Sequence, residues 1–177
     1  APDRQKLEGL QRIASQFGYT LNLNPIGNTE YLLESISNSF NGVLQITPSY
    51  FEQLIANENA AGVLNRLHSI LIGGETMSEN AFSFIKTYLS EVSVFNVYGP
   101  TEATIWSTSF KLNKANKVQL GAPLVNESIF LLSSGLQLVP FGSIGEICIG
   151  GVGLARGYLN RPELTKEKFI TNPYNPS

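Results

Sequence analysis

Residues 96–102 combine side chains that could bind a nucleotide together with its metal ion. Tyr98 offers a flat aromatic face for stacking on a base, and the Asn96 amide can both donate to and accept from a base edge. Thr101 supplies a hydroxyl for a phosphate oxygen, and Glu102 supplies a hard carboxylate oxygen suited to Mg²⁺. An ordinary strand-ending turn is the alternative interpretation, which we favour for the Tyr-Gly-Pro part alone but not for the complete segment.

A second glycine-rich segment covers residues 145–159 and reads GEICIGGVGLARGYL. Its glycine spacing does not fit the dinucleotide-binding fingerprint, and no helix is expected to begin there, so NAD binding is disfavoured. The chain also has no P-loop sequence, so ATP is not expected to be held in the Walker manner. We therefore interpret residues 150–157 as structural, with tight turns that bring strands together.

Apolar strands alternate with amphipathic helices up to the first of these segments. Strands are expected at 43–47, 69–72 and 92–96, and helices at 29–38, after Thr47-Pro48, and after a capping box formed by Thr76 and Glu79. The two later helices are expected to bury Phe51, Leu54 and Ile55, and Phe82, Ile85 and Leu89. This alternation predicts a parallel sheet whose strand carboxyl ends share one edge, where ligands of open α/β sheets bind.

The two ends of the chain differ from this central part. Residues 4–17 predict a helix and 19–23 an extended piece, and short strands are expected at 104–110, 128–132, 136–139 and 145–149. The predicted fold class is α/β, a parallel sheet with flanking helices, followed by a β-rich, barrel-like lobe. We divide the chain into a lead-in at 1–27, an α/β lobe at 28–110 and a β-rich lobe at 111–177.

Composition narrows the classes of function. The net charge is −2, so no basic surplus exists to pair with nucleic acid or an anionic membrane, and no apolar run reaches the ~20 residues of a membrane helix. We therefore expect a cytoplasmic protein that binds neither nucleic acid nor membrane. Cys148, the only cysteine, is expected to be a small core residue, and His68, the only histidine, is expected at a strand start.

Both segments resemble motifs of one enzyme family. Residues 96–102 look like the N-x-Y-G-P-T-E motif of the adenylate-forming superfamily, in the version typical of nonribosomal peptide synthetase adenylation domains. Residues 145–159 are similar to that family's G-E-L-x-I-x-G-x-G-x-A-R-G-Y-L motif, and residues 161–165 with Phe169 continue the match. Shorter matches at 43–49 and 71–75 extend the resemblance over roughly residues 28–177. It implies the fold of part of the large N-terminal domain of such an enzyme.

The resemblance implies a role for each matching residue. The nucleotide would be contacted by Gly74, Glu75, Asn96, Tyr98, Gly99 and Thr101. In this scheme Tyr98 stacks on adenine, Asn96 bonds its edge, and the backbone approaches the base at Gly74. Thr101 and Glu102 are the catalytic residues, with Thr101 on the α-phosphate of ATP and Glu102 as the ligand of Mg²⁺.

The resemblance also implies which residues surround the amino acid side chain. They are Gln45, Leu71, Gly73, Val97, Ile105 and Trp106. Trp106 is the only tryptophan, and an indole at the floor of the pocket would leave space for a very small side chain. The set is similar to that of glycine-activating domains, with alanine or another small amino acid as the alternative. Trp106 as an ordinary core residue is a further alternative.

By resemblance, the intact protein uses ATP and Mg²⁺ to activate an amino acid for natural product biosynthesis. It then loads the phosphopantetheine thiol of a peptidyl carrier protein, beside other synthetase domains. An acyl-CoA ligase of the same superfamily and a non-catalytic scaffold derived from the fold are the alternatives. The family's phosphate loop, its two aspartates and its catalytic lysine have no match here, so the fragment alone is expected to be incomplete. Residues 1–27 do not match the family, and we hypothesise that they form the exit of an inserted tailoring domain or a rebuilt helix.

Overall fold

The computed structural model describes residues 28–38 and 42–174. The predicted helix at 4–17, the extended piece at 19–23 and the lead-in at 1–27 lie outside the described residues. Within the described part, no helix combines the length and the apolar character that a membrane span needs. The chain forms two compact units, Ala1–Phe95 with Lys111–Val118 and Asn96–Phe110 with Gln119–Ser177. The lobes expected at 28–110 and 111–177 stay a prediction.

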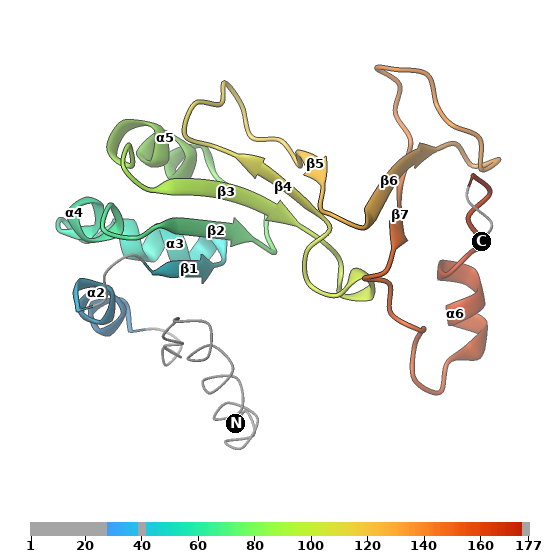
Figure 1. The fold of residues 1–177 in the computed structure, drawn as a ribbon, viewed down its shortest axis with the longest axis horizontal. Helices are drawn as coiled ribbons and strands as arrows, with labels where there is room; N and C mark the ends of the chain where they lie inside the picture. The colour runs from blue at the N-terminus through green and yellow to red at the C-terminus, as the bar shows by residue number, and fades with distance from the viewer. Residues whose placement is uncertain (1–27, 39–41, 175–177) are drawn as a thin grey trace. The chain divides into compact units, whose positions relative to one another are not determined.

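The first unit is built from alternating helices and strands (Figure 1). In chain order they are α2 (Thr29–Ser37), β1 (Val43–Ile46), α3 (Pro48–Ile55), α4 (Ala60–Leu64), β2 (Ser69–Gly73), α5 (Glu79–Tyr88) and β3 (Ser93–Tyr98), the last continuing into the second unit. β1 and β2 pair in parallel, and the five strands of the sheet follow the order β1-β2-β3-β4-β5. This mostly parallel sheet with flanking helices confirms the predicted fold class.

The start of α3 follows the predicted capping pattern. Thr47 has an extended backbone, and its side chain accepts a hydrogen bond from the backbone N–H of Tyr50. Phe51 and Leu54 are fully buried as expected. Ile55 is only half-buried, so its predicted burial is wrong. The reason is that the buried stripe of α3 follows a three-residue spacing, which ends at Leu54.

The start of α5 differs from the prediction. The capping box expected at Thr76 and Glu79 does not form, because Ser78 is the N-cap and its hydroxyl accepts from the backbone N–H of Ala81. Glu79 is therefore the first helical residue, and Thr76 is exposed before the helix. Threonine and serine are both good caps, so a local pattern cannot choose between two that lie two positions apart.

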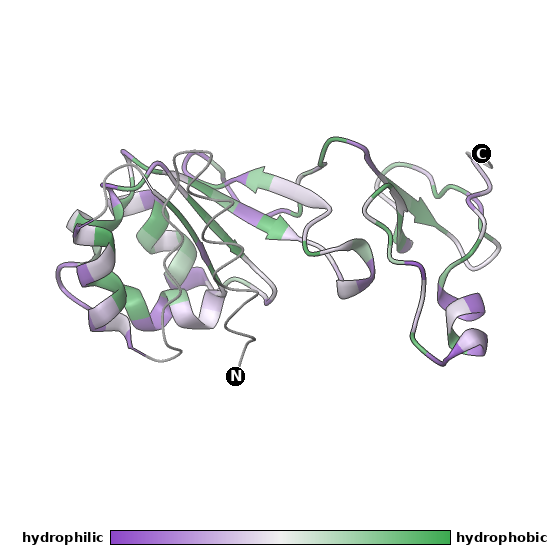
Figure 2. Cartoon of the chain, turned by 60° about the horizontal axis from the view of Figure 1, so that its bottom comes forward, coloured by the Kyte–Doolittle hydropathy of each residue, from purple (hydrophilic) through white to green (hydrophobic). Residues whose placement is uncertain are grey.

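The core of the first unit lies between its sheet and its helices. Its fully buried large side chains are Phe51, Leu54, Leu64, Ile70, Ile72, Ile85, Leu89, Val92, Val94 and Leu112. In Figure 2 the helices of this unit carry both hydrophobic and hydrophilic segments, as helices with one buried face do. Full burial of one such side chain stabilises the fold by about 1.5–3 kcal/mol. This packing holds β1 and β2, with the polar residues at their ends, in one register.

The second unit contains shorter strands and more turns. Its elements are η1 (Thr101–Ala103), β4 (Thr108–Lys111), β5 (Ala122–Pro123), β6 (Glu127–Leu132), β7 (Glu146–Gly151) and α6 (Pro162–Lys168), with the end of β4 in the first unit. β4 pairs with β5 and β6 pairs with β7, both in antiparallel orientation. The strand predicted at 104–110 begins only at Thr108, and the one predicted at 136–139 is reduced to a single bridge between Leu132 and Leu138. α4 and α6 were not predicted, since five and seven residues are too short for a periodic signal.

The only cysteine and the only histidine differ in how well their positions were predicted. Cys148 lies on β7 and is half-buried, so its predicted place in the core is wrong, because a two-stranded sheet shields its side chains incompletely. His68 directly precedes β2, as predicted. Its ring Nδ1 lies 2.8 Å from the Ser69 hydroxyl, and its carbonyl accepts from the Ser93 N–H at 3.2 Å. The position of His68 is therefore explained by the strands around it.

Candidate functional site

In the first unit, the predicted site residues lie in β1 and β2 and in the turn that follows β2. Gln45 and Leu71 are register partners on these parallel strands, so their side chains lie on the same face of the sheet. Gly73 ends β2 and is buried. Gly74 has a φ of 93° and open space where a Cβ would lie, so its backbone is accessible to a ligand.

Glu75, the next predicted residue, contacts the start of a helix. Its carboxylate Oε2 accepts a hydrogen bond from the backbone N–H of Ser49 at 3.0 Å, in the first turn of α3. A negative charge at this end of a helix satisfies a free N–H and is stabilised by the helix dipole. Glu75 thus ties the turn after β2 to α3.

In the second unit, the end of β3 presents successive side chains to opposite faces of the strand. Asn96 and Val97 are buried, and Tyr98 is half-buried. Asn96 and Tyr98 therefore share one face, and Val97 lies on the other. The Asn96 Nδ2 donates to the Gln119 carbonyl at 2.7 Å, which fixes the orientation of the amide.

The turn after β3 is tightly folded. The Ser107 N–H donates to the Tyr98 carbonyl at 2.7 Å, and a Cβ on Gly99 would lie 2.6 Å from the Ile105 carbonyl oxygen, so only glycine fits. Thr104 and Ile105 have φ values of 51° and 80°, which strain the backbone of a β-branched residue. Within this turn Thr101, Thr104 and Ile105 are exposed, whereas Glu102 and Trp106 are half-buried.

The second glycine-rich segment holds this turn in place. The Ala155 N–H donates to the Glu102 carbonyl at 2.7 Å, and the Thr104 hydroxyl donates to the Gly153 carbonyl at 2.6 Å. The Tyr158 hydroxyl donates to the Glu102 carboxylate. These partners could not be predicted from the sequence, because no spacing rule connects residues 49 or 56 positions apart. The signal that was available, the second segment itself, indicated only a structural role.

The hydrogen bond from Tyr158 holds the pKa of the Glu102 carboxyl below its ordinary value, helped by a bond to its own backbone. The same bond raises the pKa of the Tyr158 phenol. Glu102 is therefore ionised at neutral pH, the state that attracts a cation. Because the folded-state pKa of Glu102 is lowered, the bond contributes stability above the unfolded pKa and loses it as the pH falls through the folded one.

The residues around Glu102 set how a metal could be held there. Among residues 28–38 and 42–174, no three His, Cys, Asp or Glu side chains gather as a metal cluster. A cation at Glu102 would therefore take most of its ligands from phosphate oxygens and water. One carboxylate combined with substrate phosphates is a usual environment for Mg²⁺, so the residues present fit this ion.

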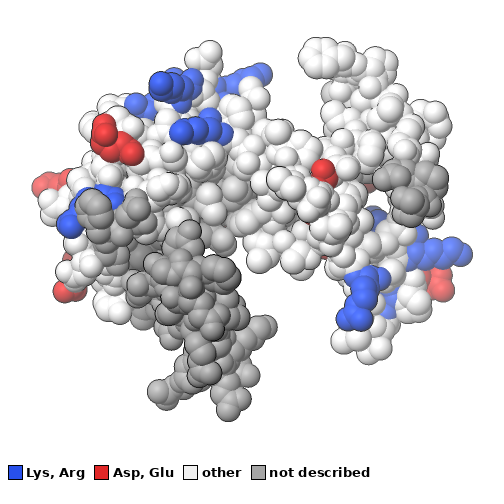
Figure 3. All heavy atoms as spheres, viewed as in Figure 1, with Lys and Arg blue, Asp and Glu red and all other residues white. Residues whose placement is uncertain are grey.

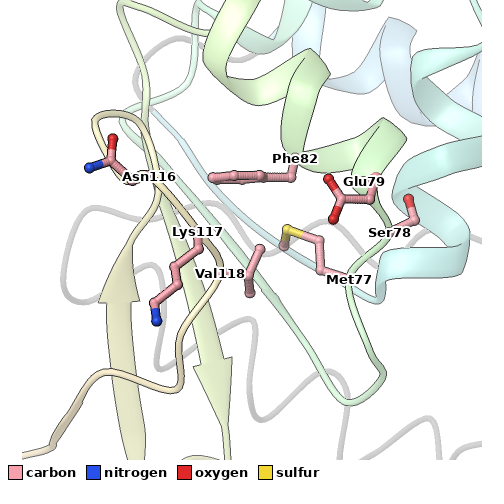
Figure 4. Close-up of a pocket in the computed structure, with 7 residues that line it drawn as sticks. All are labelled: Met77, Ser78, Glu79, Phe82, Asn116, Lys117 and Val118. Atoms are coloured by element: carbon pink, nitrogen blue, oxygen red, sulfur yellow. The ribbon is translucent and has the colours of Figure 1, made fainter.

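A pocket of about 250 Å³ in the first unit is formed by other residues (Figure 4). It is lined by Met77, Ser78, Glu79, Phe82, Asn116, Lys117 and Val118, none of which is a predicted site residue. Figure 4 shows the Phe82 ring pointing from α5 toward the loop of Asn116, with Glu79 and Lys117 adding charges of opposite sign.

On the face drawn in Figure 3, charged side chains form small separate groups within a mostly uncharged surface. Neither the pocket lining nor this surface therefore favours an anionic ligand over a cationic one.

A family model described as AMP-binding enzyme matches residues 16–159, so residues 16–27 of the lead-in match the family, contrary to the prediction. The chain belongs to the AMP-binding enzyme family. A plipastatin synthase protein of Bacillus subtilis (strain 168) is 41% identical over 133 residues, which are 74% of this chain and 5% of that protein. Bacitracin synthase 1 of Bacillus licheniformis is 39% identical over 153 residues, which are 84% of this chain and 3% of that protein. This AMP-binding chain therefore spans only a small part of its curated relatives.

Solved structures of two synthetase proteins resemble this AMP-binding chain. The N-terminal subdomain of Klebsiella oxytoca NpsA, in complex with 3-hydroxyanthranilyl-AMSN, has a TM-score of 0.73 at 25% identity, over 89% of this chain and 38% of that one. AB3403, a four-domain nonribosomal peptide synthetase bound to AMP and glycine, has a TM-score of 0.71 at 36% identity, over 85% of this chain and 11% of that one. Together with the family match, they confirm the predicted resemblance to nonribosomal peptide synthetases.

Proposed function

We propose that this chain is part of an adenylation domain, in which ATP and an amino acid form an aminoacyl adenylate and pyrophosphate. The main support is the turn after β3 in a member of the AMP-binding family. There an aromatic ring, a hydroxyl and an ionised carboxylate stand within residues 98–102, on a backbone fixed by hydrogen bonds.

Asn96 and Tyr98 bind the adenine ring in this proposal. Tyr98 stacks on the base through its half-buried ring. The Asn96 Nδ2 is committed to the Gln119 carbonyl, which leaves Oδ1 to accept a hydrogen bond from the amino group of adenine. At Gly74 the open backbone approaches the base, while Glu75 and Gly99 shape the two turns.

Thr101 and Glu102 act on the phosphates. The exposed Thr101 hydroxyl donates to an oxygen of the α-phosphate, which orients that phosphorus toward the carboxylate of the amino acid. Glu102 coordinates Mg²⁺, which when bound offsets the negative charge of the phosphates. Both residues thus lower the repulsion between two anions that must approach each other.

The amino acid side chain is enclosed by Gln45, Leu71, Gly73, Val97, Ile105 and Trp106. Glycine, or another small amino acid, is the proposed substrate. Three features support this choice: Gln45 and Leu71 share a face of the sheet, Trp106 is a large half-buried ring, and the related AB3403 is bound to AMP and glycine. That all six residues line one pocket stays a prediction.

A peptidyl carrier protein is the proposed acceptor of the activated amino acid, through its phosphopantetheine thiol. Support comes from the relatives, since the chain covers 5% of a plipastatin synthase protein and 11% of a four-domain synthetase. The other domains of such a protein would use the product in the synthesis of a peptide natural product.

The substrate proposal is tested by ATP–pyrophosphate exchange on the full-length protein. The panel contains the common amino acids together with aryl and fatty acids, because an acyl-CoA ligase would prefer the latter two. Glycine is expected to give the highest exchange. Preference for a bulky amino acid or for a fatty acid would contradict the proposed pocket for a small amino acid. Calorimetric titration with Mg·ATP adds a second test, because a non-catalytic scaffold that lost the site would not bind.

Glu102→Gln in the full-length protein is expected to lower amino-acid-dependent exchange at least about 100-fold, because it removes a negative charge that holds the metal beside the phosphates. Glu58→Gln is the matched control, since Glu58 is an exposed glutamate beyond the end of α3. Its exchange rate is expected to stay at the wild-type value. Near-wild-type exchange in Glu102→Gln would exclude Glu102 from the mechanism.

A further inference from the structure

Glu102 lies on a short turn, and the only local bond to its carboxylate that the shift of its pKa reflects comes from its own backbone. It is the middle residue of η1, a helix of three residues with no side-chain cap. Directly after this helix, Thr104 and Ile105 have backbone angles in the left-handed region. A carboxylate on such a short turn can adopt several rotamers, so its direction also depends on a partner from another part of the chain, whose bond has the larger effect on its pKa.

That partner is Tyr158, whose hydroxyl donates to Oε1 of Glu102. The bond leaves Oε2 of the carboxylate to coordinate a cation, since an ionised carboxylate has acceptor sites on both oxygens. The backbone of Glu102 is held from the same segment, because its carbonyl accepts from Ala155. One loop of the second unit therefore fixes both the main chain and the side chain of this residue.

Tyr158 is itself held in position by α6. Its backbone N–H donates to the Thr165 hydroxyl at 2.9 Å, and that hydroxyl donates to the Arg161 carbonyl at 2.9 Å. Its ring packs edge-on against Phe169, with the ring centroids 5.7 Å apart. α6 has no buried residue of its own, so these contacts are the clearest function of the helix in the described structure.

We propose that Tyr158 is a positioning residue of the nucleotide site: its hydroxyl, supported by α6, orients the Glu102 carboxylate for Mg²⁺. The inference rests on the proposed function, because it assumes that Glu102 is the metal ligand. It adds a role for residues 158–169, which from the sequence were expected only to end one family motif and to continue its match. Hydrogen-bond partners of metal ligands commonly set metal affinity by orienting the ligand.

The test measures binding of ATP to the full-length protein at increasing Mg²⁺ concentration, so it does not depend on catalysis. Tyr158→Phe is expected to raise the Mg²⁺ concentration needed for half-maximal binding about 10-fold, the lower end of the effect of losing such a partner. Binding of ATP in EDTA is expected to stay unchanged. Wild-type Mg²⁺ dependence in Tyr158→Phe would overturn the inference.

Tyr174→Phe is the matched control in the same unit. The Tyr174 hydroxyl accepts from the Leu138 N–H at 2.9 Å and donates to the Leu136 carbonyl at 3.0 Å, so its loss removes structural bonds only. Its Mg²⁺ dependence is expected to equal that of the wild type. An equal shift in both variants would mean that general loosening of the unit explains the result, against the inference.

Glu102→Gln separates this inference from the proposed function. If Tyr158 acts through Glu102, the double variant is expected to match Glu102→Gln alone, whereas additive effects would overturn the inference. A normal Mg²⁺ dependence in Glu102→Gln would instead overturn the metal role on which the proposed function rests. If Tyr158→Phe does not fold, Phe169→Leu replaces it, because this variant weakens the packing that supports the Tyr158 ring. It is expected to raise the Mg²⁺ concentration needed for half-maximal binding. An unchanged Mg²⁺ dependence would count against the inference.

Discussion

The turns that follow β2 and β3 are built in opposite ways. After β2, the backbone at Gly74 has open space beside it, and Glu75 bonds to the start of a neighbouring helix. After β3, Gly99 is enclosed by backbone atoms, and the turn is bonded to Gly153, Ala155 and Tyr158. The difference teaches that one strand end is open and tied to a helix 26 positions earlier in the chain, whereas the other is enclosed and needs a segment about 50 positions away.

Alanine at the two glycines tests this contrast most strongly. Gly99→Ala is expected to lower the free energy of unfolding by about 3 kcal/mol, because the new Cβ would lie 2.6 Å from the Ile105 carbonyl oxygen and 2.8 Å from the Ser107 nitrogen. Gly74→Ala is expected to cost about 1–2 kcal/mol, since it meets no atom but must adopt a φ of 93°. Urea unfolding of the full-length protein, followed by proteolysis of the unfolded fraction, measures both. Equal costs would show that the turn after β3 is no more crowded than the other.

Removal of one long-range hydrogen bond has a smaller expected effect. Thr104→Val deletes the 2.6 Å bond to the Gly153 carbonyl and is expected to cost about 1 kcal/mol. Amide exchange at Ile105 and Trp106 should accelerate, because the turn loses one of its attachments. Thr87→Val, at an exposed position of α5, is the control and should leave that exchange unchanged. Unchanged exchange in Thr104→Val would mean that the remaining bonds alone shape the turn.

The smallest effect concerns β7, the strand that leads into the second segment. Partial burial, with a contribution from the Glu146 charge, raises the pKa of the Cys148 thiol above its ordinary value. The thiol therefore contributes stability below the unfolded pKa, and this contribution is lost as the pH rises through the folded one. Alkylation of Cys148, followed by peptide mass spectrometry from pH 7 to 11, should show a midpoint at higher pH in the native protein than in urea. Coinciding midpoints would indicate that β7 does not shield this side chain.

Much of the first unit could be predicted because its signals are local. α2, β1, α3, β2 and β3 occur where apolar periodicity and turn residues placed them, and Thr47 caps α3 as expected. The prediction failed at the cap of α5 and at Ile55. In both cases several chemically similar residues stood close together, and tertiary packing selected among them.

The second unit was predicted less well. The strands at 127–132 and 146–151 were found, but the run at 136–139 forms one bridge and α6 was missed. Short strands and turns depend on partners far along the chain, which no local pattern reveals. The roles of the site residues stay predictions, since the structure describes their surroundings and not a bound nucleotide.

By itself, the sequence determined the family, the α/β class and the residue types at the end of β3, because each is encoded by consecutive or periodic positions. Only the tertiary structure decided which groups hold Glu102 and Thr104, and that Ser78 rather than Thr76 caps α5. The physical reason is that a hydrogen bond between distant segments needs only a donor and an acceptor that meet in space. Many residues carry such groups, so the pairing leaves no trace in the spacing of the chain.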